Sequence, residues 1–215
     1  YAYVVWGVSY PSEGGLLVID VSTPSAPIEV GSVGGLGDAR DVAVSGGWAY
    51  VVWGAYYPDA GGLRLVDVST PSAPIEVGSL DMPVRARGVA VEGNHAYVAA
   101  GETGLRVIDV STPSAPVEVG SLIPPGSASS VAVSGPYAYL GGWAGEASGG
   151  YLRVVDVSSP SAPVEVGVTG SQETVMDVTV AGRHVFLAAG SAGLYIFNDC
   201  GQFANAHASF IPAAA

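Results

Sequence analysis

Hydrophobic residues occur along this chain in short runs that are separated by turn-forming residues. Between Arg87 and Leu122 four such runs follow one another, namely Gly88–Val91, His95–Ala100, Leu105–Val110 and Pro116–Ser121. Each run is rich in Val, Ile or Tyr and is bounded by Gly, Pro, Asn or Ser, which is typical of β-strands. No stretch has the periodicity of an amphipathic helix, so we expect an all-β protein.

The links between the runs indicate how the strands pair. The first two runs of a group are joined by short links that contain Gly, such as Ser45–Trp48 and Glu92–His95. Such links are typical of tight hairpins, so neighbouring strands are expected to be antiparallel. The apolar runs are nearly continuous rather than alternating, which indicates sheets that are covered on both faces. Four antiparallel strands, called a to d here in chain order, stacked face to face around an axis make a blade of a β-propeller.

The four-strand group is repeated along the chain. The segment Asp-Val-Ser-(Thr or Ser)-Pro-Ser-Ala-Pro begins at Asp20, Asp67, Asp109 and Asp156, and a fifth approach strand ends at Asn198. The spacings between these positions are 47, 42, 47 and 42 residues, which fits one small sheet per repeat. The pattern predicts a β-propeller with five blade units, three complete and two partial, with bounds near 1–39, 40–86, 87–128, 129–176 and 177–199.

The two ends of the chain depart from the repeat. The chain opens with a b strand at Tyr1–Val5, so Tyr1 is expected to be a mature N-terminus or the start of a fragment. Residues 200–215 lose the pattern, and Ala208–Ile211 is expected either to add an outer strand or to belong to a loose tail. Closed propellers commonly share one blade between their two ends. Simple sharing does not give a whole number of blades here, so the sequence leaves the mode of closure open.

The segments Gly104–Pro116 and Val131–Leu140 resemble the LVIVD repeat of bacterial and archaeal surface propellers. The resemblance extends over about residues 1–199. It implies a propeller fold and a place outside the cell or at its surface. It implies no particular activity, because the repeat motif marks the structure of a blade rather than a site.

Charge narrows the range of partners. The chain has no Lys, and its 7 Arg face 19 acidic residues, which gives a net charge of −12. Nucleic acid and anionic membrane surfaces are therefore not expected as partners, because both require clustered basic side chains. No apolar run approaches the roughly 20 residues of a spanning helix, so direct membrane insertion is not expected either. The single Cys200 excludes an internal disulfide and is expected to be an edge thiol or to form an intermolecular bridge.

Two sets of repeated residues are expected to be structural. The corner aspartates, Asp20, Asp67, Asp109 and Asp156, can accept backbone N–H bonds from the turn that follows each of them. The strand c arginines are expected to form exposed, weakly stabilising pairs with strand d glutamates, in the order Arg64, Arg106 and Arg153 with Glu76, Glu118 and Glu165.

Candidate ligand-binding residues lie where the repeats differ. The b to c and d to a loops vary in length and composition, and antiparallel order places them at the same end of the sheets. Their aromatic rings and carboxylates suit a glycan or peptide, because rings cover apolar faces and polar groups bind hydroxyls or amides. The candidates are Trp6, Tyr10, Glu13, Trp53, Tyr56, Tyr57, Asp59, Glu102, Trp143 and Glu146. The alternative for the tryptophans is packing between blades.

Metal binding and catalysis have weaker support. No cofactor and no metal is expected, although one acidic residue in each of four b to c loops, Glu13, Asp59, Glu102 and Glu146, suggests Ca²⁺ as an alternative. Residues at the start of the innermost strands, Arg40, Asp41, Arg87 and Asp177, are expected to line an axial channel, filled either by water and ion pairs or by a substrate. The three His residues have no triad partners at a recognisable spacing.

These observations favour a non-enzymatic binding or adhesion module outside the cell, whose ligand is a glycan, a peptide or a protein. One alternative is a structural subunit that self-associates, or joins the rest of a larger protein, through blade edges. The other is an enzyme with a site in the axial channel.

Overall fold

A computed structural model describes residues 1–7, 14–55, 60–145, 149–198 and 208–211 of the chain, the last four and Asn198 by their backbone alone. Nearly all of these residues lie in short β-strands and the turns between them. Within the described ranges the only helical segment is a single 3₁₀ turn, Gly190–Ala192. The predicted all-β class is therefore confirmed. Among the described residues, no helix reaches the length and apolar character that crossing a membrane requires.

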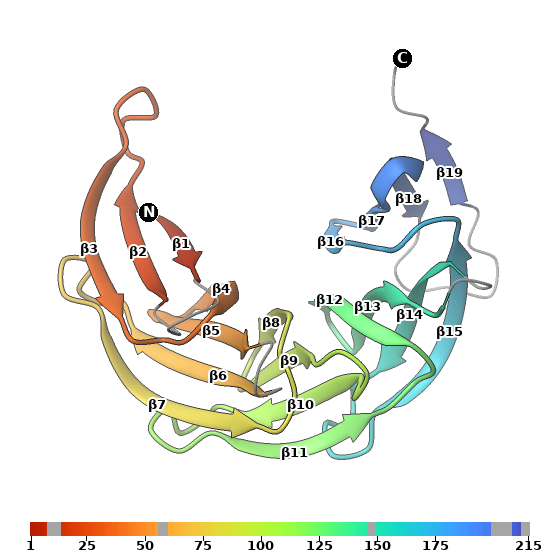
Figure 1. Cartoon of the computed structure of the whole chain (residues 1–215), viewed down its shortest axis with the longest axis horizontal. Coiled ribbons are helices and arrows are strands. Elements are labelled where there is room, and N and C mark those ends of the chain that lie inside the picture. The colour runs from red at the N-terminus through yellow and green to blue at the C-terminus, as the bar shows by residue number, and fades with distance from the viewer. Residues whose placement is uncertain (8–13, 56–59, 146–148, 199–207, 212–215) are drawn as a thin grey trace. The chain divides into compact units, whose positions relative to one another are not determined.

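The strands form five sheets, each ordered as the chain runs (Figure 1). The first contains β1 (Ala2–Trp6), β2 (Gly15–Asp20) and β3 (Ile28–Gly34). The second contains β4 (Ala39–Ser45), β5 (Trp48–Ala55), β6 (Ala60–Asp67) and β7 (Ile75–Met82). The third contains β8 (Gly88–Glu92), β9 (His95–Ala99), β10 (Leu105–Asp109) and β11 (Val117–Leu122). The fourth contains β12 (Ser127–Ser134), β13 (Tyr137–Trp143), β14 (Gly150–Asp156) and β15 (Val164–Ser171).

The fifth sheet contains β16 (Asp177–Ala181), β17 (His184–Ala188), β18 (Leu194–Asn198) and β19 (Ala208–Ile211). Strand β19 pairs antiparallel with β18, with Ile211 opposite Leu194. Of the two alternatives for the tail, the structure therefore contains the added strand. Four sheets have four strands and one has three, so the predicted count of three complete units and two partial ones was too low in complete units. The repeat could not reveal this, because residues after Asn198 no longer follow it.

Two compact units make up the chain, residues 1–98 with 108–118 and residues 99–107 with 119–215. In the first unit, β4 contacts both β1 and β8, so consecutive sheets meet through their innermost strands. Its core includes Leu16, Leu36, Val51 and Val66, all fully buried. In the second unit, β12 contacts β16 in the same way. Its core is centred on Tyr139, Leu152, Val175, Val185 and Leu187.

Both faces of the central strands are covered, as the continuous apolar runs predicted. In β14 every residue from Gly150 to Val155 is buried, and in β6 five of the eight residues are. The outer strands are joined to the next sheet by close backbone contacts. A Cβ placed on Gly31 of β3 would lie 2.2 Å from the carbonyl oxygen of Pro71, and one on Gly120 of β11 would lie 2.1 Å from that of Pro160. Glycine on strand d therefore lets the proline-containing corner of the following sheet pack against it.

Candidate functional site

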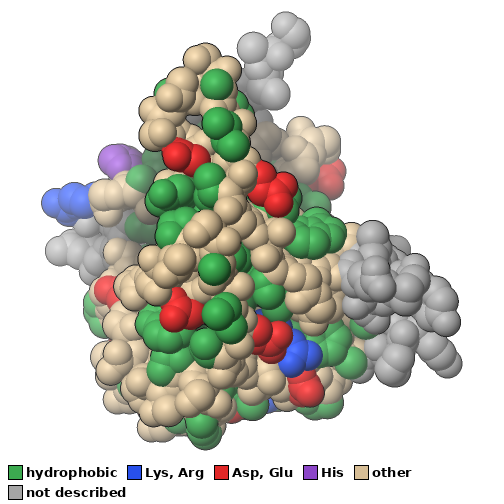
Figure 2. Space-filling view, turned by 90° about the vertical axis from the view of Figure 1, so that its left-hand side faces the viewer, with side chains coloured by type: hydrophobic (Ala, Val, Ile, Leu, Met, Phe, Trp, Pro, Cys, Tyr) green, Lys and Arg blue, Asp and Glu red, His purple; other side chains and the backbone are tan. Residues whose placement is uncertain are grey.

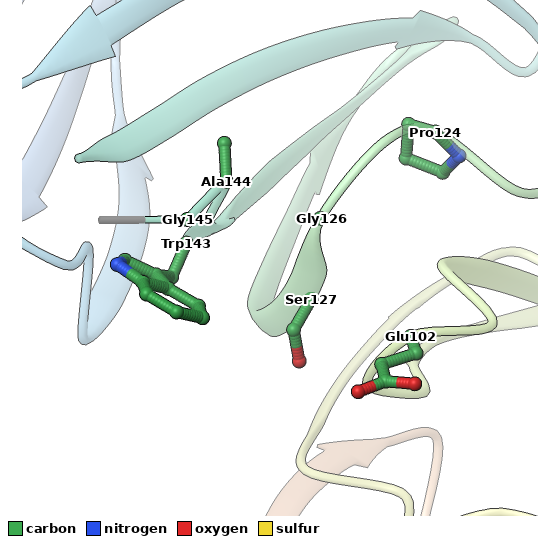
Figure 3. Close-up of a pocket in the computed structure, with 7 residues that line it drawn as sticks. All are labelled: Glu102, Pro124, Gly126, Ser127, Trp143, Ala144 and Gly145. Carbon is green, nitrogen blue, oxygen red and sulfur yellow. The ribbon is translucent and has the colours of Figure 1, made fainter. Parts of the chain in front are cut away.

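Antiparallel pairing places the b to c turns and the d to a links at one end of each sheet, called the loop end here. In the second unit the loop end contains a pocket of about 350 Å³. Its lining comes from the β9–β10 turn, the β11–β12 link and the end of β13, namely Glu102, Pro124, Gly126, Ser127, Trp143, Ala144 and Gly145 (Figure 3). We call it the Trp143 pocket. In Figure 3 the indole of Trp143, the hydroxyl of Ser127 and the carboxylate of Glu102 point toward one open region.

The turn that carries Glu102 is held rigidly. Gly101 pairs with Ala128 in an isolated antiparallel bridge, in which each backbone N–H donates to the other residue's carbonyl oxygen, at 3.1 and 2.9 Å. The Thr103 hydroxyl donates to the Ala100 carbonyl oxygen at 2.8 Å and closes the turn from the other side. These bonds hold the backbone of the turn that carries the exposed Glu102, beside the N-terminal part of β12.

The position of Trp143 differs from that of the other loop-end tryptophans. Trp6 pairs with Gly15 and Trp53 with Gly62, and both glycines lie five residues before a corner aspartate. In the fourth sheet the residue five positions before the corner aspartate Asp156 is Tyr151. It pairs with Gly142 rather than with Trp143. Trp143 therefore lies one residue further along its strand, and a shift of one residue turns a side chain to the opposite face of a sheet.

Packing against glycine accounts for Trp6 and Trp53. A Cβ on Gly15 would lie 2.3 Å from the Trp6 ring, and one on Gly62 would lie 2.6 Å from Trp53 Nε1. The Arg64 guanidinium lies 5.3 Å from the centre of the Trp53 ring and covers it from outside. Only Trp143 of these three lines the pocket, and 41% of its surface is exposed.

The other loop-end candidates lie outside the described residues, namely Tyr10, Glu13, Tyr56, Tyr57, Asp59 and Glu146. Cys200 lies outside them too. Of the four acidic residues considered for Ca²⁺, Glu102 alone is described. Across the described ranges, no three His, Cys, Asp or Glu side chains come together as metal ligands.

Two of the four channel candidates join neighbouring inner strands. Asp41 accepts backbone N–H bonds from Val42 at 2.8 Å and from Val89 of the next sheet at 2.9 Å. In the second unit, Ser130 of β12 donates its hydroxyl proton to Asp177 at 2.8 Å, and the same hydroxyl oxygen accepts the Val178 N–H at 2.9 Å. Asp41 and Asp177 therefore link adjacent sheets, which is a structural role.

The remaining channel candidates, Arg40 and Arg87, lie at the loop end of the first unit. They line a second pocket there together with Gly54, Arg85 and Ala86. Sequence reasoning missed Arg85, although the segment Arg85-Ala86-Arg87 occupies the place in its repeat that Asp38-Ala39-Arg40 occupies in the previous one. Ser127 and Ser130 were also missed, because a lone serine carries no signal of its own.

The predicted pairing between strands c and d is observed for Arg64 and for Arg153. Arg64 lies 3.6 Å from Glu76, and Arg153 lies 2.7 Å from Glu165. The Arg153 guanidinium also donates to the Pro125 carbonyl oxygen at 3.0 Å and lies 4.6 Å from the centre of the Tyr151 ring. The expectation of exposed pairs was wrong for Arg153, because this side chain is buried beneath the β11–β12 link.

A family model described as the LVIVD repeat matches residues 1–34, 36–82, 85–123 and 125–169, most of the chain. The chain belongs to the LVIVD-repeat family. Its stacked antiparallel sheets are those of a β-propeller protein, as the resemblance of the sequence implied.

Solved structures with this fold support the same conclusion. A protein of unknown function from Desulfotomaculum acetoxidans has a TM-score of 0.74 at 16% identity, over 98% of this chain and 69% of its own. The computationally designed Ika8 protein has a TM-score of 0.64 at 17% identity, over 99% of this chain and 62% of its own. The designed Ika4 protein has a TM-score of 0.56 at 15% identity, over 75% of this chain and 91% of its own. At these identities the likeness concerns the fold alone. No curated protein matches the chain.

The corner aspartates of the LVIVD repeats act as predicted. In each of the four repeats the carboxylate accepts the backbone N–H of the serine two residues later, at 2.8 to 2.9 Å. Side-chain and backbone hydrogen bonds from Ser69, Ser111 and Ser158 lower the pKa values of Asp67, Asp109 and Asp156, and bonds from Ser22, chiefly the backbone one, lower that of Asp20. These hydrogen bonds lie at the exposed surface, where water can replace a lost partner.

Proposed function

We propose that this LVIVD-repeat protein is a non-enzymatic binding module, displayed outside the cell, that holds a glycan in the Trp143 pocket. The observation that carries the proposal is the exposed indole of Trp143 beside the Ser127 hydroxyl and the Glu102 carboxylate, in a cavity of about 350 Å³. This volume is near the lower end of the range for small-ligand sites. It suits one or two sugar units of a longer chain.

The chemistry of the lining supports a glycan. The flat indole can cover the apolar face of a sugar ring, which carries its C–H groups. Ser127 can donate to or accept from a ring hydroxyl, and the Glu102 carboxylate can accept from two hydroxyls. Because Glu102 lies on a turn closed by the Gly101–Ala128 bridge, binding would cost little loop ordering.

The same lining argues against hydrolysis of the bound glycan. Glycosidases generally use two carboxyl groups on either side of the scissile bond. The described lining of the Trp143 pocket supplies Glu102 as its one carboxylate, and it contains no His, Cys or Tyr. Binding is therefore the activity that this group of side chains supports best.

The finer arrangement of the fold is part of the proposal. We take the five sheets as five blade units, with β4, β8, β12 and β16 as their inner strands and β1 in that place in the first sheet. The contacts of β4 with β1 and β8, and of β12 with β16, support this order.

A direct test is a glycan array followed by calorimetry with the best binder. Trp143→Ala should weaken binding by about 2 kcal/mol, roughly thirtyfold, because aromatic hot spots carry much of the affinity. Trp48→Ala is the matched control, since Trp48 lies in the β4–β5 hairpin at the end of its sheet away from the loop end. Equal affinities of wild type and Trp143→Ala, or release of reducing sugar from the bound glycan, would contradict the proposal. Surface labelling of intact producing cells tests the location.

A second candidate function is assembly with further copies through the outer strands. The first residue of each outer strand in four sheets is an exposed Ile or Val, with 57 to 63% of its surface accessible, namely Ile28, Ile75, Val117 and Val164. Figure 2, which views the side of β3 and β7, shows hydrophobic side chains interspersed with acidic ones on that surface. Strands at sheet edges with apolar side chains are templates for pairing.

Ile75→Lys with Val117→Lys should abolish any concentration-dependent association measured by analytical ultracentrifugation. Val44→Lys is the control, because Val44 is exposed on the inner strand β4. A wild-type protein that stays monomeric at high concentration would remove this candidate.

A further inference from the structure

The second pocket, in the first unit, is positively charged in a strongly acidic chain. It has a volume of about 220 Å³ and is lined by Arg40, Gly54, Arg85, Ala86 and Arg87. Three of the seven arginines of the chain, which has no lysine, therefore border one small cavity. We call it the arginine pocket.

The backbone brings the three arginines to the lining of one pocket. Arg40 is the extra residue of a β-bulge in β4, where the pairing with β5 shifts between Ala39 and Asp41. A bulge re-aims the side chain that it carries. The Arg40 guanidinium donates to the Gly54 carbonyl oxygen at 3.2 Å, which directs it to the loop end of β5.

Arg85 and Arg87 flank the buried Ala86 in the link from β7 to β8. This link passes close to β5 because residue 54 is glycine. A Cβ on Gly54 would lie 2.9 Å from both the Ala86 carbonyl oxygen and the Arg85 Cβ. Any larger residue at position 54 would therefore push the link away from Arg40.

Two described carboxylates lie near these arginines. Asp38 forms an ion pair with Arg40, and its side chain is almost fully buried. Both oxygens of Asp41 accept backbone N–H bonds, from Val42 and Val89. Neither aspartate lines the pocket. The described lining of the pocket therefore carries three arginines and no carboxylate, and like charges gathered at one place favour an anion between them.

We infer that the arginine pocket binds an oxyanion: the carboxylate, sulfate or phosphate group of a small ligand. The planar fork of a guanidinium matches the oxygens of these groups and can bind them through two parallel hydrogen bonds. The volume admits a free inorganic anion or a single sugar acid and excludes a large ligand. Because the chain as a whole repels anions, binding must come from this local group of arginines.

The test uses the whole chain and four probes: sulfate, inorganic phosphate, glucuronate and, as the neutral comparison, glucose. Binding is followed by calorimetry and by NMR of the seven arginine Nε–H signals. We expect an anionic probe to shift the signals of Arg40, Arg85 and Arg87 and glucose to shift none of them. Tighter binding of glucuronate than of sulfate or phosphate would identify a sugar acid as the ligand, and the reverse order a free inorganic anion.

Arg85→Gln and Arg87→Gln should each weaken binding of the anionic probe about tenfold, since each removes a charge-assisted hydrogen bond. Arg183→Gln is the matched control. It removes the same charge from the exposed β16–β17 turn and should leave binding unchanged. Equal losses in all three variants would show a general charge effect and overturn the inference, as would the absence of any anion-induced shift. Trp143→Ala should leave anion binding intact, so this inference and the proposed glycan site can fail independently.

Discussion

Tyr151 of β14 lies over Gly142 of β13, so that a Cβ on Gly142 would be 2.6 Å from the tyrosine hydroxyl oxygen. In the second sheet the same cross-strand pair is inverted, with Trp53 on strand b over Gly62 on strand c. Each ring is covered by the strand c arginine of its own sheet, Arg153 or Arg64. An aromatic ring therefore fills equivalent space in each of the two sheets. In the second sheet the ring comes from strand b, and in the fourth sheet it comes from strand c.

Replacing Tyr151 by Phe should stabilise the protein slightly at neutral pH. The buried Tyr151 hydroxyl has no hydrogen-bond partner in the described part of the chain, so its removal should raise stability by up to about 1 kcal/mol. Chemical denaturation of wild type and Tyr151→Phe measures the difference. A loss of more than about 1 kcal/mol would indicate a partner that the structure does not contain.

Alkaline pH gives an independent check on Tyr151. Burial raises the pKa of its hydroxyl to about 12, against 10 in an unfolded chain. Because the unfolded state loses this proton first, the free energy of unfolding of the wild type should fall as pH rises from about 10 to 12. The loss is on the order of 2 to 3 kcal/mol. The Tyr151→Phe variant should lack this part of the pH dependence, and parallel curves for the two proteins would refute the assignment.

Trp53 and Trp143 should differ in what they contribute. Trp53→Ala should lower the free energy of unfolding by about 2 to 4 kcal/mol, because its ring packs between Gly62 and Arg64. Trp143→Ala should cost less than Trp53→Ala, about 1 kcal/mol, because 41% of the Trp143 surface is exposed. Thermal melting of both variants decides the point, and similar losses would remove the reason to assign Trp143 to a ligand.

Acid should weaken the corners of all four LVIVD repeats together. Hydrogen bonds lower the pKa values of Asp20, Asp67, Asp109 and Asp156 below the unfolded value of 3.8. Their contribution to the free energy of unfolding is therefore fully present above about pH 4. It is lost as the pH falls through the lower pKa values that these aspartates have in the folded state. A variant with Asn at all four positions keeps the side-chain acceptors but cannot titrate. Its melting temperature should therefore depend less on pH between pH 5 and 2 than that of the wild type. An unchanged slope would show that other carboxylates control acid unfolding.

Mutation of Ser130 should reveal how much the hydrogen bonds between the fourth and fifth sheets contribute to stability. Ser130→Ala removes the donor to Asp177 and one of the two acceptors of the buried Val178 N–H, the other being Asp177 Oδ1, and should cost about 1 to 2 kcal/mol. Ser129→Ala is the neighbouring comparison, since the Ser129 hydroxyl donates to the Val175 and Gly141 carbonyl oxygens and not to Asp177, and it should show no coupling with Asp177→Ala. A double-mutant cycle with Asp177→Ala should give a coupling energy of at least about 0.5 kcal/mol, and additive effects would contradict the role assigned to Asp177.

The sequence by itself determined the repeated features of this protein. Strand positions, hairpin pairing and the aspartate corners depend on residues close together in the chain, and they occur several times, so local patterns were sufficient. The same reasoning predicted the partners Glu76 and Glu165 for Arg64 and Arg153, because residues on adjacent strands of a regular sheet keep a fixed register.

Only the tertiary structure decided the residues that make the repeats differ. Trp53 and Trp143 both lie near the loop end of a b strand, but a register difference of one residue turns them to opposite faces, and cross-strand pairing alone reveals it. Likewise, Arg40 meets Arg85 and Arg87 through a bulge in β4 and the close approach of a link to Gly54. Such meetings depend on contacts between residues about 45 positions apart, where no local pattern specifies which side chains converge.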